Sequence, residues 1–197
     1  MGNTFTALRR TVEPASEPVT TALMKDHLRV THSDDDTYID SLIAAARNSV
    51  EEILSRSLIS QTWAASFDSI GDNDRVRLPR PNLISVSSVN YIDGDGNSQA
   101  VSSGDYITNT TSEPGQIYFT TVPDYDSEYD NPLTVTFVSG YGASASDIPD
   151  PIIHAIKLLV GHWYDMREAV VSPQGNNPSE IPFGVQSLLA PYRFKYS

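Results

Sequence analysis

The sequence contains no cysteine among its 197 residues. This absence excludes disulfide bonds, thiolate metal ligands and a cysteine nucleophile, and it is typical of proteins made in a reducing compartment. No apolar run approaches the ~20 residues that a membrane helix needs, and the opening MGNTFTALRR lacks the apolar stretch of a secretory signal. We therefore expect a soluble protein that acts where it is made, without a membrane partner.

Basic residues are also scarce, because 13 Lys and Arg stand against 25 Asp and Glu and the net charge is −12. Affinity for nucleic acid comes largely from basic side chains that neutralise phosphates, so this balance argues against a general nucleic-acid binder. The deficit is uneven, since no Lys or Arg occurs between Arg80 and Lys157. This acidic stretch is either a solvated face or a surface that repels a passing polyanion. The candidates for the second role are Asp93, Asp95, Asp124, Asp126, Glu128 and Asp130.

Motifs for catalysis or metal binding are missing from the sequence. The run DGDGN at 93–97 begins like an EF-hand loop, but Ser98 and Gly104 occupy the positions that need a glycine and a bidentate glutamate. A hairpin turn is the better interpretation. His154 and His162 are too far apart on one predicted helix to bind a metal from adjacent turns. There is no HExxH, GxSxG or GxxxxGK[ST] either, so we expect no cofactor and no enzymatic activity.

Hydrophobic periodicity separates helical ends from a β-rich middle. After an extended arm through about residue 19, apolar residues recur at helical spacing over 22–29 and 35–55. From residue 59 the period falls to about two, and short runs rich in Val, Ile, Tyr and Thr alternate with turn residues. Helical spacing returns at residue 148 for about five turns. A polar loop over 171–180 then leads to a short helical turn and an extended basic tail.

These elements predict an α+β fold with a helical core and a β-rich insert. The long N-terminal helix packs with the C-terminal helix, and a small antiparallel sheet or barrel lies between them in the sequence. The tail is apolar and basic although the chain is acidic, and an exposed apolar patch marks a partner surface more often than a frayed end. The expected divisions are 1–57 (arm and helices), 58–147 (β-rich insert), 148–172 (C-terminal helix) and 173–197 (loop and docking tail).

Several segments, in order, resemble the head–tail connector proteins (adaptor or head-completion proteins) of long-tailed bacteriophages and gene transfer agents. They are LRRTVEPASEPVT with the following HLRV, DDDTYIDSLIAAARNSVEEILSRSLISQTW, LPRPNLISVSSVNYIDGDG, VTFVSGYG with IPDPIIHAIKLLVGHWYDMREAV, and PFGVQSLLAPYR. The resemblance covers nearly the whole chain, although the segment 113–130 is less typical of the family.

The resemblance implies a structural role at the head–tail interface of a virion, for a protein made in the bacterial host cytoplasm. Helices form a ring, expected to be a dodecamer, that docks on the portal protein after DNA packaging. The ring offers a platform to the next neck or tail-completion protein, and DNA passes through it without specific binding. The C-terminal segment reaches the portal, and we expect it to be a disordered arm that orders on binding. The resemblance and the tail composition together nominate Phe183, Leu188, Leu189, Pro191, Tyr192, Arg193, Phe194 and Lys195 for this contact.

Two other classes of function stay open. One is a stand-alone β-rich binding module of the host with a helical frame, and the other is a hydrolase that uses an unrecognised pair of carboxylates. Ring formation would separate a connector from both, and a strongly perturbed carboxylate in a deep cleft would favour the hydrolase. Within the connector interpretation, the acidic stretch is expected to line a channel whose wall does not hold the phosphates of passing DNA.

Overall fold

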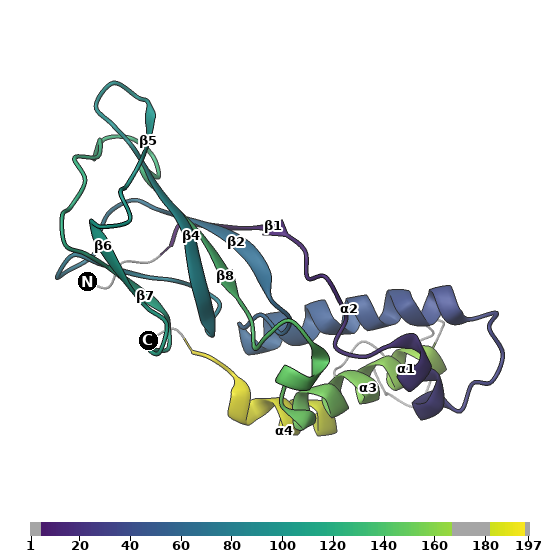
Figure 1. The fold of residues 1–197 in the computed structure, drawn as a ribbon. Coiled ribbons are helices and arrows are strands. Elements are labelled where there is room, and N and C mark those ends of the chain that lie inside the picture. Colours follow the sequence, from purple (N-terminus) through teal and green to yellow (C-terminus); the bar gives the residue numbers. More distant parts are fainter. Residues whose placement is uncertain (1–4, 167–181, 196–197) are drawn as a thin grey trace, which may run out of the picture. The chain divides into compact units, whose positions relative to one another are not determined.

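The computed structural model describes residues 5–166 and 182–195 (Figure 1). They divide into two compact units, each built from two separate stretches of the chain. The β unit comprises 5–15 and 59–141, and the helical unit comprises 16–58 and 142–195 without the undescribed stretch. The predicted α+β class is confirmed, because strands and helices occupy different parts of the chain.

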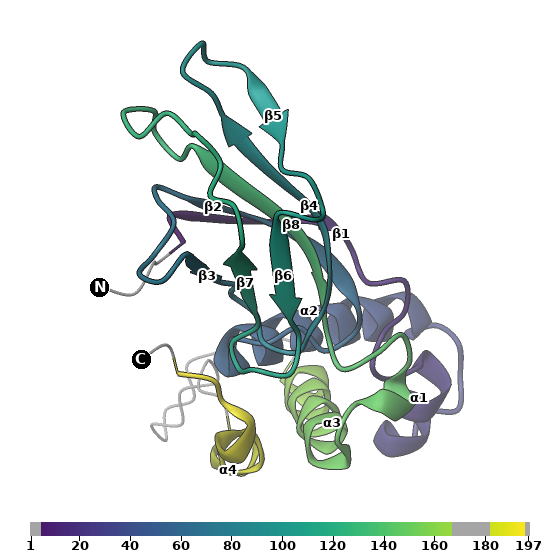
Figure 2. The same ribbon diagram turned by 60° about the vertical axis from the view of Figure 1, so that its left-hand side comes forward.

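The β unit contains two antiparallel sheets (Figure 2). The larger sheet has the strand order β1-β2-β8-β4-β5, and the smaller sheet has the order β3-β7-β6. Strand β8 therefore pairs with β2 and β4, which both precede it in the chain by many residues. The bounds are β1 (Ala7–Val12), β2 (Gln61–Phe67), β3 (Arg75–Arg77), β4 (Leu83–Ile92), β5 (Ser98–Ala100), β6 (Tyr106–Asn109), β7 (Gln116–Phe119) and β8 (Leu133–Ser139).

One apolar core joins the two sheets. Strands β2 and β8 alternate buried and half-buried residues along their whole length, as strands with one face on a core do. Phe67 and Phe137 of the larger sheet lie in the same buried cluster as Phe119 of the smaller sheet. Each is at most 2% exposed, and burial of a side chain of this size contributes roughly 1.5–3 kcal/mol. Apolar burial therefore fixes the small sheet over the large one.

The N-terminal segment differs from its prediction as an extended arm grouped with the helices. It forms β1, which pairs with β2 from Ala7↔Ser66 to Val12↔Thr62 at the edge of the larger sheet. Residues 5–15 thus belong to the β unit, because their backbone hydrogen bonds go to β2.

A close backbone approach requires a glycine directly after β8. Gly140 has φ of +149°, and a Cβ at this position would lie 2.7 Å from the Ser60 backbone nitrogen. Its own N–H donates to the Asn82 carbonyl at 3.0 Å. A larger residue would push the end of β8 away from the segment that leads into β2.

The helical unit is built around α2 and α3, which pack on each other as predicted. Helix α1 contacts both, and α4 packs mainly on α3. The expected continuation of α3 through 172 and the polar loop over 171–180 fall largely on 167–181, which lies outside the described residues. The bounds are α1 (Thr21–Leu28), α2 (Asp36–Leu54), the 3-10 turn η1 (Ala145–Asp147), α3 (Asp150–Asp165), α4 (Phe183–Leu189) and the 3-10 turn η2 (Ala190–Tyr192).

Apolar residues at three- and four-residue spacing explain the long helices. Helix α2 buries Ile39, Ile43 and Val50 on one face, and α3 buries Ile152 and Leu159. The first residues of α1 and α3 also favour helix initiation. The Thr20 hydroxyl accepts the N–H of Leu23 at the start of α1, and a proline lies in the first turn of α3.

The helical unit also buries an ion network. The Arg47 side chain, 5% exposed, donates from Nε and Nη2 to the two carboxylate oxygens of Glu17, at 2.8 and 3.2 Å. Its Nη1 lies 3.7 Å from Glu51, which is 3% exposed and accepts the N–H of Leu58 at 2.8 Å. The network therefore ties the segments before α1 and after α2 to the middle of α2.

Candidate functional site

Within residues 5–166 and 182–195, no group of three or more His, Asp or Glu side chains is arranged to hold a metal ion. The described helices are also too short or too polar to cross a membrane. The candidate sites predicted from the sequence are surfaces, and the structure places them in two regions: the C-terminal tail in the helical unit and the acidic loops in the β unit.

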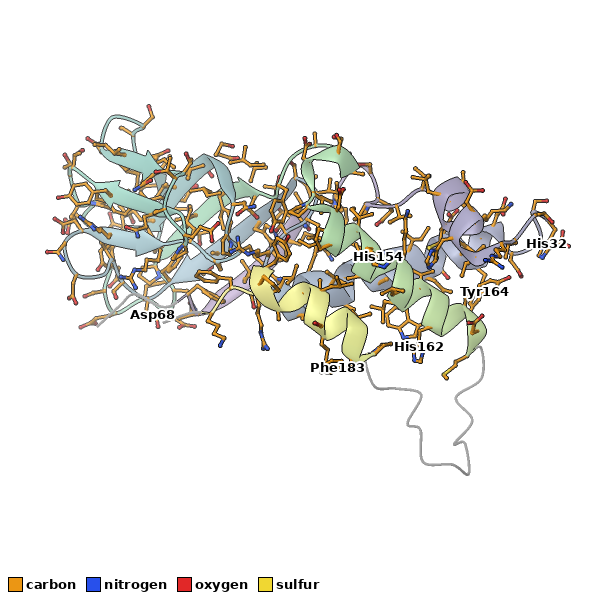
Figure 3. All side chains as sticks on the ribbon, turned by 90° about the horizontal axis from the view of Figure 1, so that it is seen from below. His32, Asp68, His154, His162, Tyr164 and Phe183 are labelled. Carbon is orange, nitrogen blue, oxygen red and sulfur yellow. The ribbon has the colours of Figure 1, made fainter. Side chains whose placement is uncertain are left out.

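Helix α4 carries the start of the predicted docking tail. Phe183 lies in its first turn and is 85% exposed (Figure 3), although it is one of the largest apolar side chains of the tail. Val185 and Leu189 are almost fully buried and hold α4 against α3. Leu188 is half-buried. Leu189, predicted to face the portal, would become accessible only if α4 left α3.

The end of the tail is attached to the C-terminal end of α2. The N–H of Phe194 donates to the Leu54 carbonyl at 2.9 Å, and Nε of Arg56 donates to the Tyr192 carbonyl at 2.8 Å. The Arg56 guanidinium also lies 5.8 Å from the centroid of the Phe194 ring. The tail was predicted to be a disordered arm before binding. In the structure it is held against α2 instead. The last carbonyls of a helix lack partners within the helix, and here the Leu54 carbonyl accepts a tail N–H.

A groove of about 700 Å³ lies beside α4. The predicted tail residues Phe183, Leu189, Arg193 and Lys195 line it, whereas Leu188, Pro191, Tyr192 and Phe194 do not. The groove thus combines an apolar floor with two exposed cations. Sequence reasoning missed Ile53 of α2, which also lines the groove, because its helical spacing assigned it to the core.

The six predicted acidic residues lie in two loops at one end of the β unit. Asp93 and Asp95 belong to the β4–β5 hairpin, and the other four belong to the β7–β8 loop. The loops lie side by side, since the N–H of Asp126 donates to the Ile92 carbonyl at 2.8 Å and the N–H of Ile92 donates to the Pro132 carbonyl at 2.9 Å. The structure therefore brings the two groups of carboxylates together.

The DGDGN run is a hairpin turn, as predicted. Asp93 Oδ1 accepts the N–H groups of Asp95 and Asn97, and Oδ2 accepts the Gln99 amide at 2.8 Å. These hydrogen bonds, that from Gln99 foremost, hold the pKa of Asp93 below its ordinary value. Gly96 has φ of +79°, which suits glycine in such a turn. The Asp93 carboxylate thus stabilises the loop.

Two histidines pack against each other between α1 and α3. The rings of His27 and His154 meet edge to face with centroids 6.5 Å apart. Figure 3 labels His154 on α3. Burial, followed by the charge of Lys157 and the neighbouring His154, lowers the pKa of His27 below 6.5. His162 Nε2 is buried without a hydrogen-bond partner among the described residues.

Comparison with known proteins gives one matching family and several solved chains that share the fold. A family model described as head completion protein matches residues 19–194. No curated protein matches the chain. A solved chain from the neck of an empty gene transfer agent (GTA) particle, computed with C6 symmetry, is 21% identical with a TM-score of 0.79, over 97% of both chains.

Two further solved chains have the same fold. One, from the virion of a native GTA particle, is 22% identical with a TM-score of 0.77 over 96% of both chains. The other, from the neck of a native GTA particle computed with C12 symmetry, is 20% identical with a TM-score of 0.69, over 95% of this chain and 97% of that chain. These likenesses show the fold, and the family model spans residues of both units. The chain belongs to the head completion protein family.

Proposed function

We propose that the chain is a structural adaptor in the neck of a tailed phage or phage-like particle. It is made in the bacterial host cytoplasm, forms a ring on the portal protein, and offers a platform to the next neck or tail-completion protein. The observation that carries this proposal is family membership over residues 19–194, together with a fold shared over nearly the whole chain with GTA neck chains. A dodecameric ring is compatible with both the C6 and the C12 symmetry of those necks.

The C-terminal tail contributes the portal contact in this proposal. Phe183, Arg193 and Lys195 are exposed and surround one groove, so an apolar side chain and two cations are available to a partner. Exposed aromatic and arginine side chains are typical of the residues that dominate binding energy at interfaces. Leu188 and Leu189 act mainly by holding α4 in place, because the first is half-buried and the second is 1% exposed.

The acidic loops contribute a surface that DNA does not adhere to. Asp93, Asp95, Asp126 and their neighbours in the β7–β8 loop gather at one end of the β unit, and no Lys or Arg occurs between Arg80 and Lys157. If this end faces the channel, its negative potential lowers the time that phosphates spend on the wall. A variant with Asp93, Asp95 and Asp126 changed to Asn should retain more DNA at low salt in a filter-binding assay. Equal retention by both proteins would contradict this role.

A structural role is favoured over catalysis. The pKa of Asp93 is lowered by hydrogen bonds in an exposed hairpin, whereas a carboxylic acid that donates a proton needs a raised pKa. The alternative of a stand-alone binding module gains no specific support from the described surfaces. Family membership accounts for both units together, which a β-rich module in a helical frame does not.

Co-sedimentation with the cognate portal ring tests the proposal. Truncation after Ser187 is a poor variant, because it removes the buried Leu189 and would unfold α4. We expect Phe183→Ala and the pair Arg193→Glu with Lys195→Glu each to weaken portal binding roughly tenfold or more, which corresponds to about 1.4 kcal/mol. Leu23→Ala on α1, another exposed apolar position at 51% exposure, is the control and should bind normally. Failure of the unaltered chain to sediment with the portal would overturn the adaptor role.

A further inference from the structure

The outer face of the small sheet carries an exposed cross-strand row. Arg75 of β3 pairs with Tyr118 of β7, which pairs with Ile107 of β6. Ile107 is 59% exposed and Tyr118 is 40% exposed, while Val76 and Ile117 beside them point into the core and are fully buried. The exposed isoleucine of the edge strand β6 and the exposed tyrosine of the central strand β7 both lie outside the buried core, and exposed apolar patches mark interaction sites.

Two arginines complete this surface, which we name the docking face: Arg75, Arg77, Ile107 and Tyr118. The Arg75 guanidinium lies 5.3 Å from the centroid of the Tyr118 ring, so the pair is already stacked. Arg77 lies one row further along β3 and is exposed. Within the described part of the chain, neither arginine has a carboxylate partner. Tyrosine and arginine are the residue types enriched at the centres of protein interfaces.

The β7–β8 loop has the complementary composition. Val122 is 45% exposed and Tyr129 is 49% exposed, and the exposed carboxylates Asp124 and Glu128 lie between them. Among the described residues, these carboxylates have no cationic partner. The loop is attached to its own unit instead through the N–H of Asp126, which donates to the Ile92 carbonyl at 2.8 Å, and within the loop the Asp126 carboxylate accepts the N–H of Glu128 at 2.9 Å. The loop thus offers acidic and apolar groups on a held backbone.

We propose that the docking face binds the β7–β8 loop of a second copy of this chain. Each copy carries both surfaces, so the contact is heterologous and repeats around a closed ring. A chain with a net charge of −12 repels its own copies, and pairing unpartnered arginines with unpartnered carboxylates offsets that repulsion where the copies meet. The inference rests on the proposed ring and adds a β-unit contact to those between helices. It assigns Asp124 and Glu128 to the neighbouring copy and leaves the other four acidic residues to the channel.

Charge reversal tests the pairing. We expect Arg75→Glu with Arg77→Glu, and separately Asp124→Arg with Glu128→Arg, each to raise the concentration needed for ring formation at least tenfold in mass photometry with the portal present. The chain with all four substitutions should form rings again. A 1:1 mixture of the two double variants should also form rings, because each supplies the partner that the other lacks. Rings that form equally well with every variant would overturn the inference.

Cysteine trapping supplies an independent measurement, since the natural chain has no cysteine. The variant Tyr118→Cys with Tyr129→Cys should give ladders of linked copies under mild oxidation. The matched control Tyr118→Cys with Ala100→Cys, whose second position is an exposed residue of β5, should not. A chain that sediments with the portal but gives no ladder overturns this inference alone. A chain that gives the ladder but ignores the portal overturns the adaptor role alone.

Discussion

The two units of the molecule bury charged side chains in different ways. The β unit has an apolar core of sheet residues, and its buried Arg80 lies over the Trp63 ring, 4.9 Å from the centroid. The helical unit buries Arg47 and Glu51 next to its apolar stripe. The helical unit is made of residues 16–58 and residues after 142. Its polar contacts connect segments that flank the helices, at Glu17, at Leu58 and in the tail at Tyr192.

We infer that apolar packing determines the arrangement of the β unit, whereas polar contacts also help to determine that of the helical unit. Apolar burial is sufficient where strands pair along their length, because register already fixes the neighbours. Packed helices lack such a ladder, and specific hydrogen bonds and ion pairs then select one arrangement of the segments that flank them. In the proposed adaptor, a partner could displace these polar contacts and bind the tail without disturbing the core of the sheets.

The largest effect is expected from the buried ion network. Arg47→Met removes the cation that contacts both Glu17 and Glu51, and removal of one partner from a buried pair costs roughly 3–5 kcal/mol. Unfolding in urea followed by circular dichroism at 222 nm measures this loss. Lys25→Met removes a more exposed ion pair with Asp36 and should cost less than about 1 kcal/mol. Equal losses in the two variants would contradict the importance of burial.

A core truncation in the β unit should have a comparable or slightly smaller effect. Leu133 is fully buried in β8, and Leu133→Ala removes apolar contacts and leaves a cavity, at a cost of roughly 2–5 kcal/mol. Tryptophan fluorescence reports on this unit when Trp163 of α3 is first replaced by phenylalanine, because the remaining Trp63 lies in the same cluster. Leu133→Met, which nearly conserves volume, is the control and should cost less than about 1.5 kcal/mol.

A smaller effect is expected where the tail meets α2. Arg56→Ala removes the hydrogen bond to the Tyr192 carbonyl and the contact with Phe194, so stability should fall by about 1 kcal/mol. Hydrogen exchange of the Phe194 amide should accelerate while exchange in β2 and β8 stays unchanged. Exchange that accelerates equally in both units would show that Arg56 stabilises the whole chain and not the tail attachment alone.

The smallest effect is a pH dependence at the α1–α3 contact. Burial and the nearby Lys157 and His154 lower the pKa of His27, so the folded state binds fewer protons there than the unfolded state. The resulting stability is fully present above pH 6.5, the ordinary value, and is lost as the pH falls through the lowered pKa. The free energy of unfolding, measured from pH 8 to pH 5, should fall less in His27→Gln than in the natural chain. Parallel curves would exclude this histidine as the cause.

The fold was predictable where the periodicity was strong. The stripe of α2 and the alternation along β2 and β8 give the correct elements, because burial of one face determines each pattern. Strand β1 was not predicted as part of a sheet, since ALRRTV is mostly exposed and owes its conformation to pairing with the distant β2. Local sequence carries no signal for such a partner.

The surfaces were less predictable than the fold. Tail composition correctly placed Phe183 and Arg193 on an exposed surface, but it could not tell that Leu189 is covered by the chain's own helices. The docking face was missed altogether, because strand pairing alone brings Arg75, Ile107 and Tyr118 into one row. A sequence shows which side chains are apolar, whereas the tertiary structure decides what covers them.

The most direct test of the adaptor role is the mass of the protein by multi-angle light scattering, alone and mixed with its cognate portal ring. We expect one discrete complex whose added mass equals that of a ring of copies, and this mass should stay nearly constant when the chain is in excess. A monomer alone is compatible with assembly templated by the portal. A chain that stays monomeric at high concentration while the portal elutes unchanged would contradict the central claim.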